Sequence, residues 1–492
     1  MKNILYIFLI LGGLAACQDY EEINENPNEP TEVSPDVLLN ASIRSSVNTN
    51  VDAAFLLGNN AAQLTAKTLR TEVDDYNWNA FPTVWEGFYA PLTDLKGVSD
   101  FAEDLNDPAL EALAIIMRSW IFSNLTNAYG NIPYSEAING LNNEFNPAYD
   151  DQEFIYMDIL DELERANNLL AESDPGIESD LLFNRDFEKW RKFCNSLRLR
   201  LLMMASNKMD VTSRFSQIVN NEPIMESNAD NAVFSYLSTF PNQFLLIPIK
   251  TGDFDAVAIS STFVDLMEEY NDPRLYRYAR PNNEDFDNFF PDSSVVGADN
   301  GRNTETCSKI GSRLGVPYYN YPDLTTAADL GIDIADGVIM TYAEVQFLLA
   351  EATAKGWISG DVEGYYRSGI EASMVYHQVN LDPFGWDSFD DFYTNSGVAY
   401  SAVTDIWEQK WVNSFFHGLE PYFDVRRWYI ESGNSWDGIP FLDAPCSNVN
   451  DDQLPMRFPY PGEEQSLNPI NYQNAVSEIG EDTKNTRTWL TN

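Results

Sequence analysis

Apolar residues recur every three or four positions over long stretches of the chain, which is the period of a helix buried on one face. The clearest stretch spans 108–128, where Asp107 before Pro108 fits a helix N-cap followed by proline in the first turn. The same period returns in 151–171 and 186–205. The apolar stripe of the first stretch is made by Leu110, Leu113, Met117, Trp120, Ile121 and Leu125. Three consecutive amphipathic helices are therefore predicted.

A second group of helices is predicted later in the chain. Residues 341–356 and 362–379 have the pattern of a helical pair, and Gly356 suits the left-handed position that follows a helix. Ser359 or Asp361 suits the cap of the second helix. A further helix is expected over roughly 401–416.

Two long stretches lack the helical period. Residues from about 225 to 340 and from 433 to 492 are rich in Gly, Pro, Asn and Asp, and such long loops are usually functional or hold short strands. The pattern predicts a mostly α fold, a tetratricopeptide-like scaffold of helical hairpins with long irregular loops and minor short strands. No Pro/Gly/Ser-rich linker interrupts residues 36–492, so a single α-helical domain is expected there.

The N-terminus has the pattern of a secretory signal. Residues 1–16 place Lys2 before an apolar run that is too short to span a bilayer and ends in small residues. The sequence Leu-Ala-Ala-Cys, which ends at Cys17, resembles the lipobox of bacterial lipoproteins, where the cysteine thiol receives the anchoring lipid. An ordinary signal peptide with a chance cysteine is the alternative.

Residues 17–35 are polar, acidic and proline-bearing, which predicts a flexible acidic tether. Within it Asp19, Glu21 and Glu22 resemble the export signal that sends Bacteroidetes lipoproteins to the outer face of the cell. A merely solvated tether is the alternative. The expected location is therefore the outer membrane, through a lipid anchor, with the protein facing the cell exterior.

The chain is strongly acidic, with 76 Asp and Glu against 30 Lys and Arg and a formal net charge of −46. Such a surface repels phosphates, so nucleic acid is excluded as a partner by any simple electrostatic route. Aromatic residues make up 13% of the chain, whereas disordered acidic chains lack them. The composition therefore predicts a folded acidic protein.

Three cysteines remain once Cys17 is assigned to the anchor. An odd number spread over hundreds of residues does not indicate a disulfide framework. Cys194 lies on an apolar helical face and is expected in the core. Cys307 and Cys446 lie in loop-like stretches, and the sequence leaves open whether they pair.

Five ordered segments carry a family resemblance. The most telling is 112–137, a helix that runs into the corner Tyr-Gly-Asn-Ile-Pro-Tyr. Segment 84–98 precedes it, and segments 185–203, 340–357 and 407–428 follow it in order. From the lipobox to the C-terminus, the chain resembles the SusD/RagB family of nutrient-binding outer-membrane lipoproteins.

This resemblance implies a scaffold of four degenerate helix-turn-helix repeats with a ligand face made of irregular loops. It implies a protein that binds an oligosaccharide or polysaccharide, or a peptide in some members, and acts as a lid on a SusC-like TonB-dependent transporter. The polar residues in the family segments are interpreted as buried pairing that locks helices together. They are Asn195, Arg198, Arg200, Glu420, Asp424, Arg426 and Arg427.

Exposed aromatic planes with polar neighbours are what a neutral glycan requires, because sugars offer flat CH faces and hydroxyl groups. The first candidate is the loop 70–81, where Tyr76 and Trp78 alternate with Asp75 and Asn77. In the family, the loop between the first two helices contributes to the ligand face. The alternative is a connecting loop whose Trp78 fills the core.

The second candidate is the insertion 281–322, from which Arg313 and Tyr319 are the predicted ligand contacts. Phe289 and Phe290 in the same insertion are expected to form the loop's own small core. Trp386 and Trp436 are weaker candidates. Asn283, Asp285 and Asp287 superficially resemble a calcium loop, but the required Gly and bidentate Glu are missing. No cofactor is predicted, and a structural calcium ion held by scattered carboxylates stays open.

A secreted glycoside hydrolase is the main rival interpretation. It would need two carboxylates roughly 5–10 Å apart, and with 76 acidic residues such pairs have no diagnostic weight. No G-x-S-x-G elbow, HExxH motif, P-loop or dinucleotide fingerprint is present. His377 and His417 are isolated in the sequence, which disfavours a histidine metal centre. The sequence therefore predicts a binding protein and not an enzyme.

Overall fold

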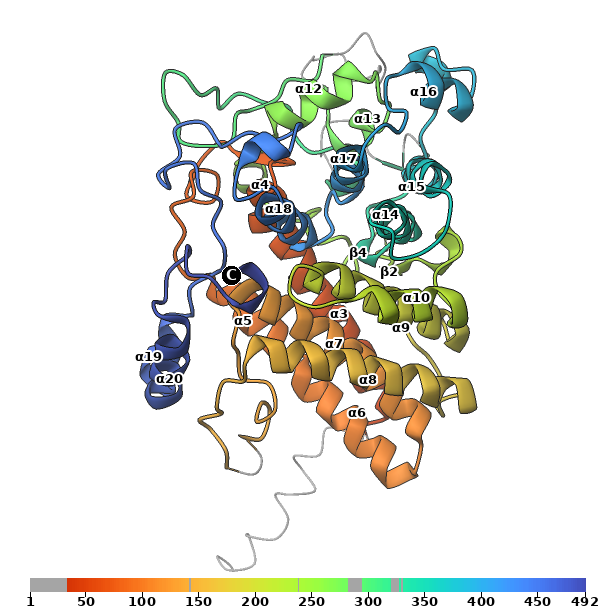
Figure 1. The fold of residues 1–492 in the computed structure, drawn as a ribbon, viewed down its shortest axis with the longest axis vertical. Helices are drawn as coiled ribbons and strands as arrows, with labels where there is room; N and C mark the ends of the chain where they lie inside the picture. The colour runs from red at the N-terminus through yellow and green to blue at the C-terminus, as the bar shows by residue number, and fades with distance from the viewer. Residues whose placement is uncertain (1–32, 141–142, 238, 282–293, 320–326, 329–330) are drawn as a thin grey trace, which may run out of the picture.

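The computed structural model describes residues 33–492, except 141–142, 238, 282–293, 320–326 and 329–330. Figure 1 shows long helices side by side in the lower half of the molecule, a second group of helices above them, and loops with short helices at the upper end. No helix of the described ranges is long and apolar enough to cross a membrane. The predicted mostly α scaffold is confirmed.

The lower group consists of α3 (Pro35–Ala53), α6 (Leu92–Leu105), α7 (Pro108–Tyr129), α8 (Gln152–Glu172) and α9 (Phe187–Ala205). Each of the last four packs against the next one in the chain. Asp107 caps α7 as predicted, because its carboxylate accepts the Leu110 N–H at 3.0 Å. Almost every side chain of α7 is buried, so this helix is the centre of the lower group.

The upper group consists of α14 (Tyr342–Ala354), α15 (Val362–Tyr376), α17 (Val403–Asn413) and α18 (Glu420–Glu431). Thr341 caps α14, and Gly356 follows the helix with a φ of +74°. The helices predicted at 341–356, 362–379 and 401–416 are therefore all present, each within a few residues of its expected ends.

Helix α3 links the two groups. It packs against α6 below, and it continues into the π-helical turn η1 (Ala54–Gly58) and α4 (Asn59–Ala61) above. Gly58 lies so close to Gly418 that a Cβ would meet the Gly418 carbonyl oxygen at 1.9 Å. Only a residue without a side chain fits this crossing.

Short elements connect the helices. Strand β1 (Thr65–Lys67) pairs antiparallel with β3 (Val257–Ile259), and β2 (Ala232–Phe234) pairs antiparallel with β4 (Gly337–Met340). The shorter helices are α5 (Pro82–Tyr89), α10 (Thr212–Asn221), α11 (Thr251–Phe254), α12 (Ser261–Glu269), α13 (Leu275–Tyr278), α16 (Phe389–Asn395), α19 (Gly462–Leu467) and α20 (Pro469–Ile479).

The two stretches predicted to be irregular contain more helix than expected. Helices α11, α12 and α13 lie in the first, and α19 and α20 lie in the second. Most of them have one to three turns, which is too short to produce a recognisable period in the sequence. The predicted short strands are present as β2, β3 and β4.

Buried ion pairs join the two groups of helices. Arg200 of α9 contacts Glu344 of α14 at 2.6 Å and Glu420 of α18 at 3.3 Å, and all three are at least nine-tenths buried. Within the upper group, Arg427 of α18 contacts Glu351 of α14 at 2.6 Å. The sequence-based interpretation of these residues as a lock between helices is therefore confirmed for both arginines.

These arginines lower the pKa of Glu344 and Glu351 below its usual value, but not that of Glu420. Burial alone would raise the pKa of Glu351, but the Arg427 guanidinium lowers that pKa to about 2. For Glu420 burial dominates over the pull of Arg200, and the pKa is raised to about 7. The Arg427–Glu351 pair is therefore the most firmly charged part of the lock.

Replacing Glu351 by alanine is expected to lower the free energy of unfolding by about 3–5 kcal/mol, because Arg427 would remain buried without its bidentate partner. Asp390→Ala, which removes an exposed ion pair with Arg367, is expected to cost less than about 1 kcal/mol. Urea unfolding of the two variants and wild type measures both values. Equal losses would contradict the lock.

The same pair predicts a pH dependence. The folded pKa of Glu351 lies below its ordinary value of 4.5, so its contribution to stability is complete above the unfolded pKa and is lost as pH falls toward the folded one. The stability difference between wild type and Glu351→Ala is therefore expected to shrink between about pH 5 and pH 2.

Candidate ligand-binding face

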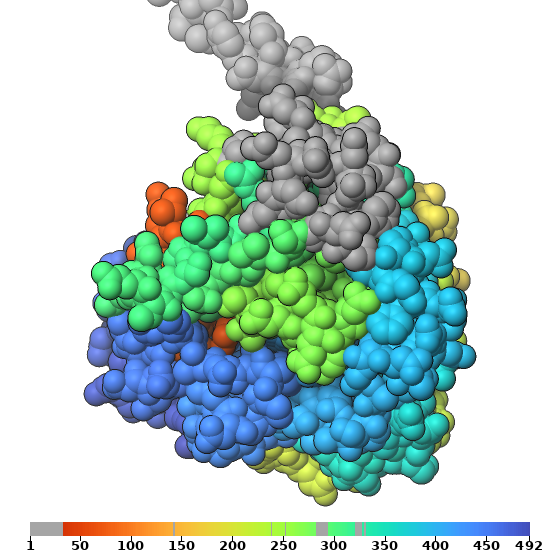
Figure 2. All heavy atoms as spheres, turned by 90° about the horizontal axis from the view of Figure 1, so that it is seen from above, coloured from red at the N-terminus to blue at the C-terminus, as the bar shows by residue number. Residues whose placement is uncertain are grey.

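Loops from distant parts of the chain meet at the upper end of the molecule. They are residues 62–78, 295–314 and 443–452, which we call the loop face. Figure 2 looks onto this end and shows the surface hollowed there. Residues near 60–75 are visible at the base of the hollow, between the segment near 300 and the segment near 440. The face is therefore a shallow depression with walls from separate loops.

One buried amide holds the base of this face together. The Asn300 side chain donates to the carbonyl oxygens of Asn60 at 3.2 Å and Thr65 at 2.8 Å, and it accepts the Ser260 hydroxyl at 2.7 Å. Ser260 directly follows β3 and bridges to Ala298. The strand pair β1–β3 and the 295–314 loop are thus fixed to one another by hydrogen bonds that water cannot reach.

A disulfide ties the 295–314 loop to the C-terminal loop. Cys307 and Cys446 are bonded, with their Cα atoms 6.0 Å apart. The Cys446 N–H donates to the Asn300 carbonyl at 2.9 Å. Gly301, with a φ of +120°, lies where a Cβ would meet the Cys446 carbonyl oxygen at 1.8 Å. The pairing that the sequence left open is present, and Cys194 is the free, buried cysteine of the described chain.

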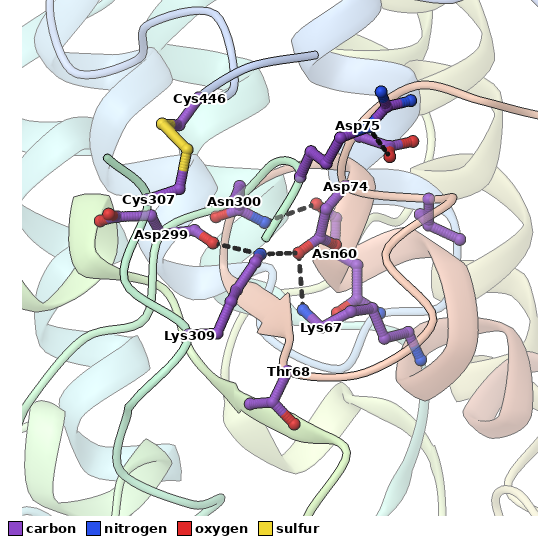
Figure 3. Close-up of polar contacts among 12 residues, drawn as sticks. Asn60, Lys67, Thr68, Asp74, Asp75, Asp299, Asn300, Cys307, Lys309 and Cys446 are labelled. Carbon is purple, nitrogen blue, oxygen red and sulfur yellow. Dashed lines mark hydrogen bonds and ion pairs between the residues drawn. A yellow bond between two sulfur atoms is a disulfide. The ribbon is translucent and has the colours of Figure 1, made fainter. Parts of the chain in front are cut away.

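A charged cluster lies beneath the face, as Figure 3 shows. The buried Asp74 carboxylate accepts the Lys67 main-chain N–H at 2.6 Å and contacts the Lys309 ammonium at 3.4 Å. Lys309 also donates to the Asp299 carbonyl oxygen at 2.6 Å. The cluster therefore pins the 295–314 loop onto the 62–78 loop.

Burial shifts the titration of this cluster toward neutrality. It raises the pKa of Asp74 to about 7 against the opposing pull of Lys309, and it lowers the pKa of the Lys67 side chain to about 8. One Asp74 oxygen has no hydrogen-bond partner among the described residues. The net charge of the cluster therefore changes with pH near neutrality.

Exposed donors lie above the cluster. The Arg302 side chain is 51% exposed, and its Nε donates to Asp75 at 3.3 Å. Arg70 and Asn77 are also exposed. Leu69 and Ile310 add apolar surface on the same loops. The face can therefore offer guanidinium and amide hydrogen-bond groups beside apolar patches.

The two predicted aromatic contacts of the first loop lie in the core. Tyr76 is fully buried, and Trp78 is 6% exposed. The Trp78 ring packs on Tyr422 and Phe458, and its Nε1 donates to the Val73 carbonyl at 2.9 Å. These positions favour the alternative in which Trp78 fills the core. The loop is folded inward because the transfer of two large aromatic rings from water to the core lowers the free energy of the folded chain.

Asp75 and Asn77 hold the loop together at the surface. Asp75 is buried and accepts both the Asn77 N–H at 3.1 Å and the Arg302 guanidinium. Asn77 remains accessible. The structure thus brings two predicted residues together with Arg302, which the sequence reasoning missed because it lies 227 positions from Asp75.

The predicted contacts of the second loop occupy different environments. Arg313 is 43% exposed and pairs with Asp255 at 2.7 Å. Tyr319 is 4% exposed, and its ring stacks on Phe254 at 4.0 Å. Tyr319 is therefore part of the loop's own core, while Arg313 remains accessible.

The two weaker aromatic candidates and the possible calcium ligands remain to be placed. Trp386 and Trp436 are half-buried and donate to the Asn271 and Asp452 carbonyls. The calcium-like loop residues and the aromatic pair at 289–290 lie outside the described residues. Within the described ranges, no group of three or more His, Cys, Asp or Glu side chains is placed to hold a metal ion.

The packed helices form a scaffold, and the loop face lies at one end of it. The family model described as "SusD-like_2: Starch-binding associating with outer membrane" matches residues 27–461. The chain belongs to this SusD-like family, whose members are non-catalytic binding proteins associated with the outer membrane. No curated protein sequence matches the chain.

Solved structures agree with this membership. An outer-membrane protein of Bacteroides vulgatus ATCC 8482, described in connection with nutrient binding, has 27% identity and a TM-score of 0.78, covering 94% of this chain and 100% of its own. A SusD homologue of Bacteroides fragilis NCTC 9343 has 25% identity and a TM-score of 0.73, covering 94% and 99%. A chitin-binding SusD homologue of Flavobacterium johnsoniae has 19% identity and a TM-score of 0.74, covering 92% and 98%.

Removing the disulfide by Cys307→Ser with Cys446→Ser is expected to lower the free energy of unfolding by about 2–5 kcal/mol, because the bond closes a long loop. Reductant should lower the melting temperature of wild type in the same direction. The Cys194→Ser variant serves as control and should keep the reductant-sensitive shift. A melting temperature that the double substitution leaves unchanged would show that other contacts hold the loops.

Proposed function

We propose that the protein binds an oligosaccharide or polysaccharide at the loop face and delivers it to a SusC-like TonB-dependent transporter. The observation that carries this proposal is the set of exposed donors, Arg302, Arg70 and Asn77, held on a rigid polar base. Sugar hydroxyls accept hydrogen bonds from such groups. The name of the Flavobacterium johnsoniae relative, a chitin-binding protein, supports a glycan ligand.

The rigidity of the face favours binding without a large entropy cost. The disulfide, the Asn300 hydrogen bonds and the Asp74 cluster fix all three loops before a ligand arrives. Solvent-exposed hydrogen bonds contribute only about 1 kcal/mol each, so affinity in the micromolar to millimolar range is expected. Affinity of this strength suits a protein that must release its cargo to a transporter.

A peptide ligand is the second candidate. The same guanidinium and amide groups can bind main-chain carbonyls or carboxylates. Arg302 is partly neutralised by Asp75, and the chain carries a net charge of −46, which disfavours acidic peptides. A neutral glycan therefore fits the face better.

The N-terminal segments complete the proposal. Residues 1–16 act as a signal peptide, lipid on Cys17 anchors the protein, and residues 17–35 act as the tether of a single domain at 36–492. A tether keeps the domain near its transporter at high effective concentration without rigid contact. The acidic residues after Cys17 support an orientation toward the cell exterior.

Arg302→Ala is expected to weaken the affinity for whichever polysaccharide the wild type binds by about tenfold, equivalent to about 1.4 kcal/mol. The reason is that the substitution removes an exposed charged donor from the loop face. Affinity electrophoresis against a panel of polysaccharides identifies the ligand and measures the change. Arg165→Ala is a matched control, since Arg165 is 46% exposed and ion-paired on α8. Retardation that Arg302→Ala leaves intact would move the ligand away from this face, and retardation by no polysaccharide would favour the peptide candidate.

Cys17→Ala is expected to release the protein from the membrane, because a single thiol carries the anchor. The variant should appear in the soluble fraction of fractionated cells, whereas wild type should remain with the outer membrane and be accessible to external protease. A membrane-bound Cys17→Ala variant would show that another contact retains the protein.

A further inference from the structure

A second cavity lies apart from the loop face, between the segment that leads into β4 and the C-terminal end of α15. It has a volume of about 190 Å³, which suits a ligand of monosaccharide size or smaller and is below the usual range of drug-sized sites. The exposed residues Asp333 and Gln378 are at its rim, where their side chains bond to each other at 2.7 Å. Its inner wall contains Asp336 and His377.

The Asp336 carboxylate has no cationic partner among the described residues. It accepts the Tyr376 hydroxyl at 3.1 Å and a hydrogen bond from Ser235. Burial raises the pKa of Asp336, and the nearby Asp333 carboxylate raises it further. A largely buried carboxylate without a counter-charge is costly, so the cavity electrostatically favours a cation.

The one cation that lines the cavity is turned toward the main chain. Arg277 donates through Nε to the His377 carbonyl oxygen at 3.0 Å, and its terminal nitrogen donates to the Gln378 carbonyl oxygen. Burial lowers the pKa of Arg277, and no carboxylate contributes to that shift. Arg277 therefore shapes the rim without neutralising Asp336.

Aromatic rings and aliphatic side chains form the rest of the wall. Phe415 and Phe416 are nearly fully buried, and the Phe416 ring stacks on Tyr318 at 4.6 Å. Tyr376 adds a fourth ring beside Asp336. The negative faces of aromatic rings attract ammonium groups, with about 0.5–2 kcal/mol for each well-placed contact. The carboxylate and the aromatic rings therefore both favour a positively charged ligand.

His377 supplies a further unused polar atom. Its Nε2 is buried and has no hydrogen-bond partner within the described part of the chain. Burial lowers the pKa of His377 well below its usual value, so the imidazole is neutral and adds no competing positive charge.

We propose that this cavity binds a small organic ammonium ion, such as a protonated amino sugar or an amino alcohol. The ammonium group contacts the Asp336 carboxylate and lies beside the Tyr376 ring. A neutral sugar of the same size would leave the carboxylate without a counter-charge. The site is separate from the loop face and does not depend on the function proposed for that face.

The test compares glucosamine with glucose, a pair that differs in one ammonium group. Isothermal titration at a pH of about 6.5, where the amine is protonated, is expected to show glucosamine binding at least tenfold tighter than glucose. Choline is a second probe, since it carries an ammonium group. Equal binding of glucosamine and glucose, or no binding of glucosamine and choline, would overturn the proposal.

Asp336→Asn is expected to weaken glucosamine binding at least tenfold, because it removes the negative charge and keeps the shape. Its melting temperature should not fall, since the amide oxygen still accepts from Tyr376 and an uncompensated charge is gone. Asp94→Asn on α6 is the control, as its carboxyl pKa is also raised by burial, and it should bind as wild type. Arg302→Ala should bind glucosamine normally, which separates this site from the loop face. Wild-type affinity in Asp336→Asn would contradict the assignment.

Discussion

One buried arginine connects the two groups of helices, and a second joins two helices of the upper group. Arg200 reaches from α9 to Glu344 of α14 and Glu420 of α18, and Arg427 reaches from α18 to Glu351 of α14. Because a stranded buried charge costs several kcal/mol, these contacts make the packing of the upper helices on the lower ones specific as well as tight. The 443–452 loop follows α18, whose position depends on these contacts.

The loop face shows how irregular chain can be made rigid without secondary structure. A disulfide, the buried Asn300 amide and the Asp74–Lys309 contact each join segments that are far apart in sequence. Hydrophobic rings that could have faced a ligand, those of Tyr76 and Trp78, are used to anchor the face from below. The surface that remains has polar groups beside the exposed side chains of Leu69 and Ile310 and few aromatic planes, which agrees with a cargo protein that binds weakly and releases.

The two binding sites that we propose differ in their charge. The loop face presents exposed arginines on a strongly acidic molecule, whereas the cavity beside α15 presents a carboxylate and aromatic rings without a free cation among its described lining. The first arrangement suits a neutral polyol or a carbonyl-rich chain, and the second suits an ammonium ion. The loop face is therefore expected to bind neutral ligands, and the cavity beside α15 is expected to bind positively charged ones.

The sequence by itself determined the helical scaffold, because long helices that bury one face leave a period in the chain that needs no knowledge of their partners. It also identified Arg200 and Arg427 as structural residues and the family to which the chain belongs. Only the tertiary structure decided the pairing of Cys307 with Cys446, the burial of Trp78 and the meeting of Arg302 with Asp75. These depend on loops hundreds of residues apart, and an aromatic residue in a polar loop has the same sequence pattern whether it faces a ligand or the core.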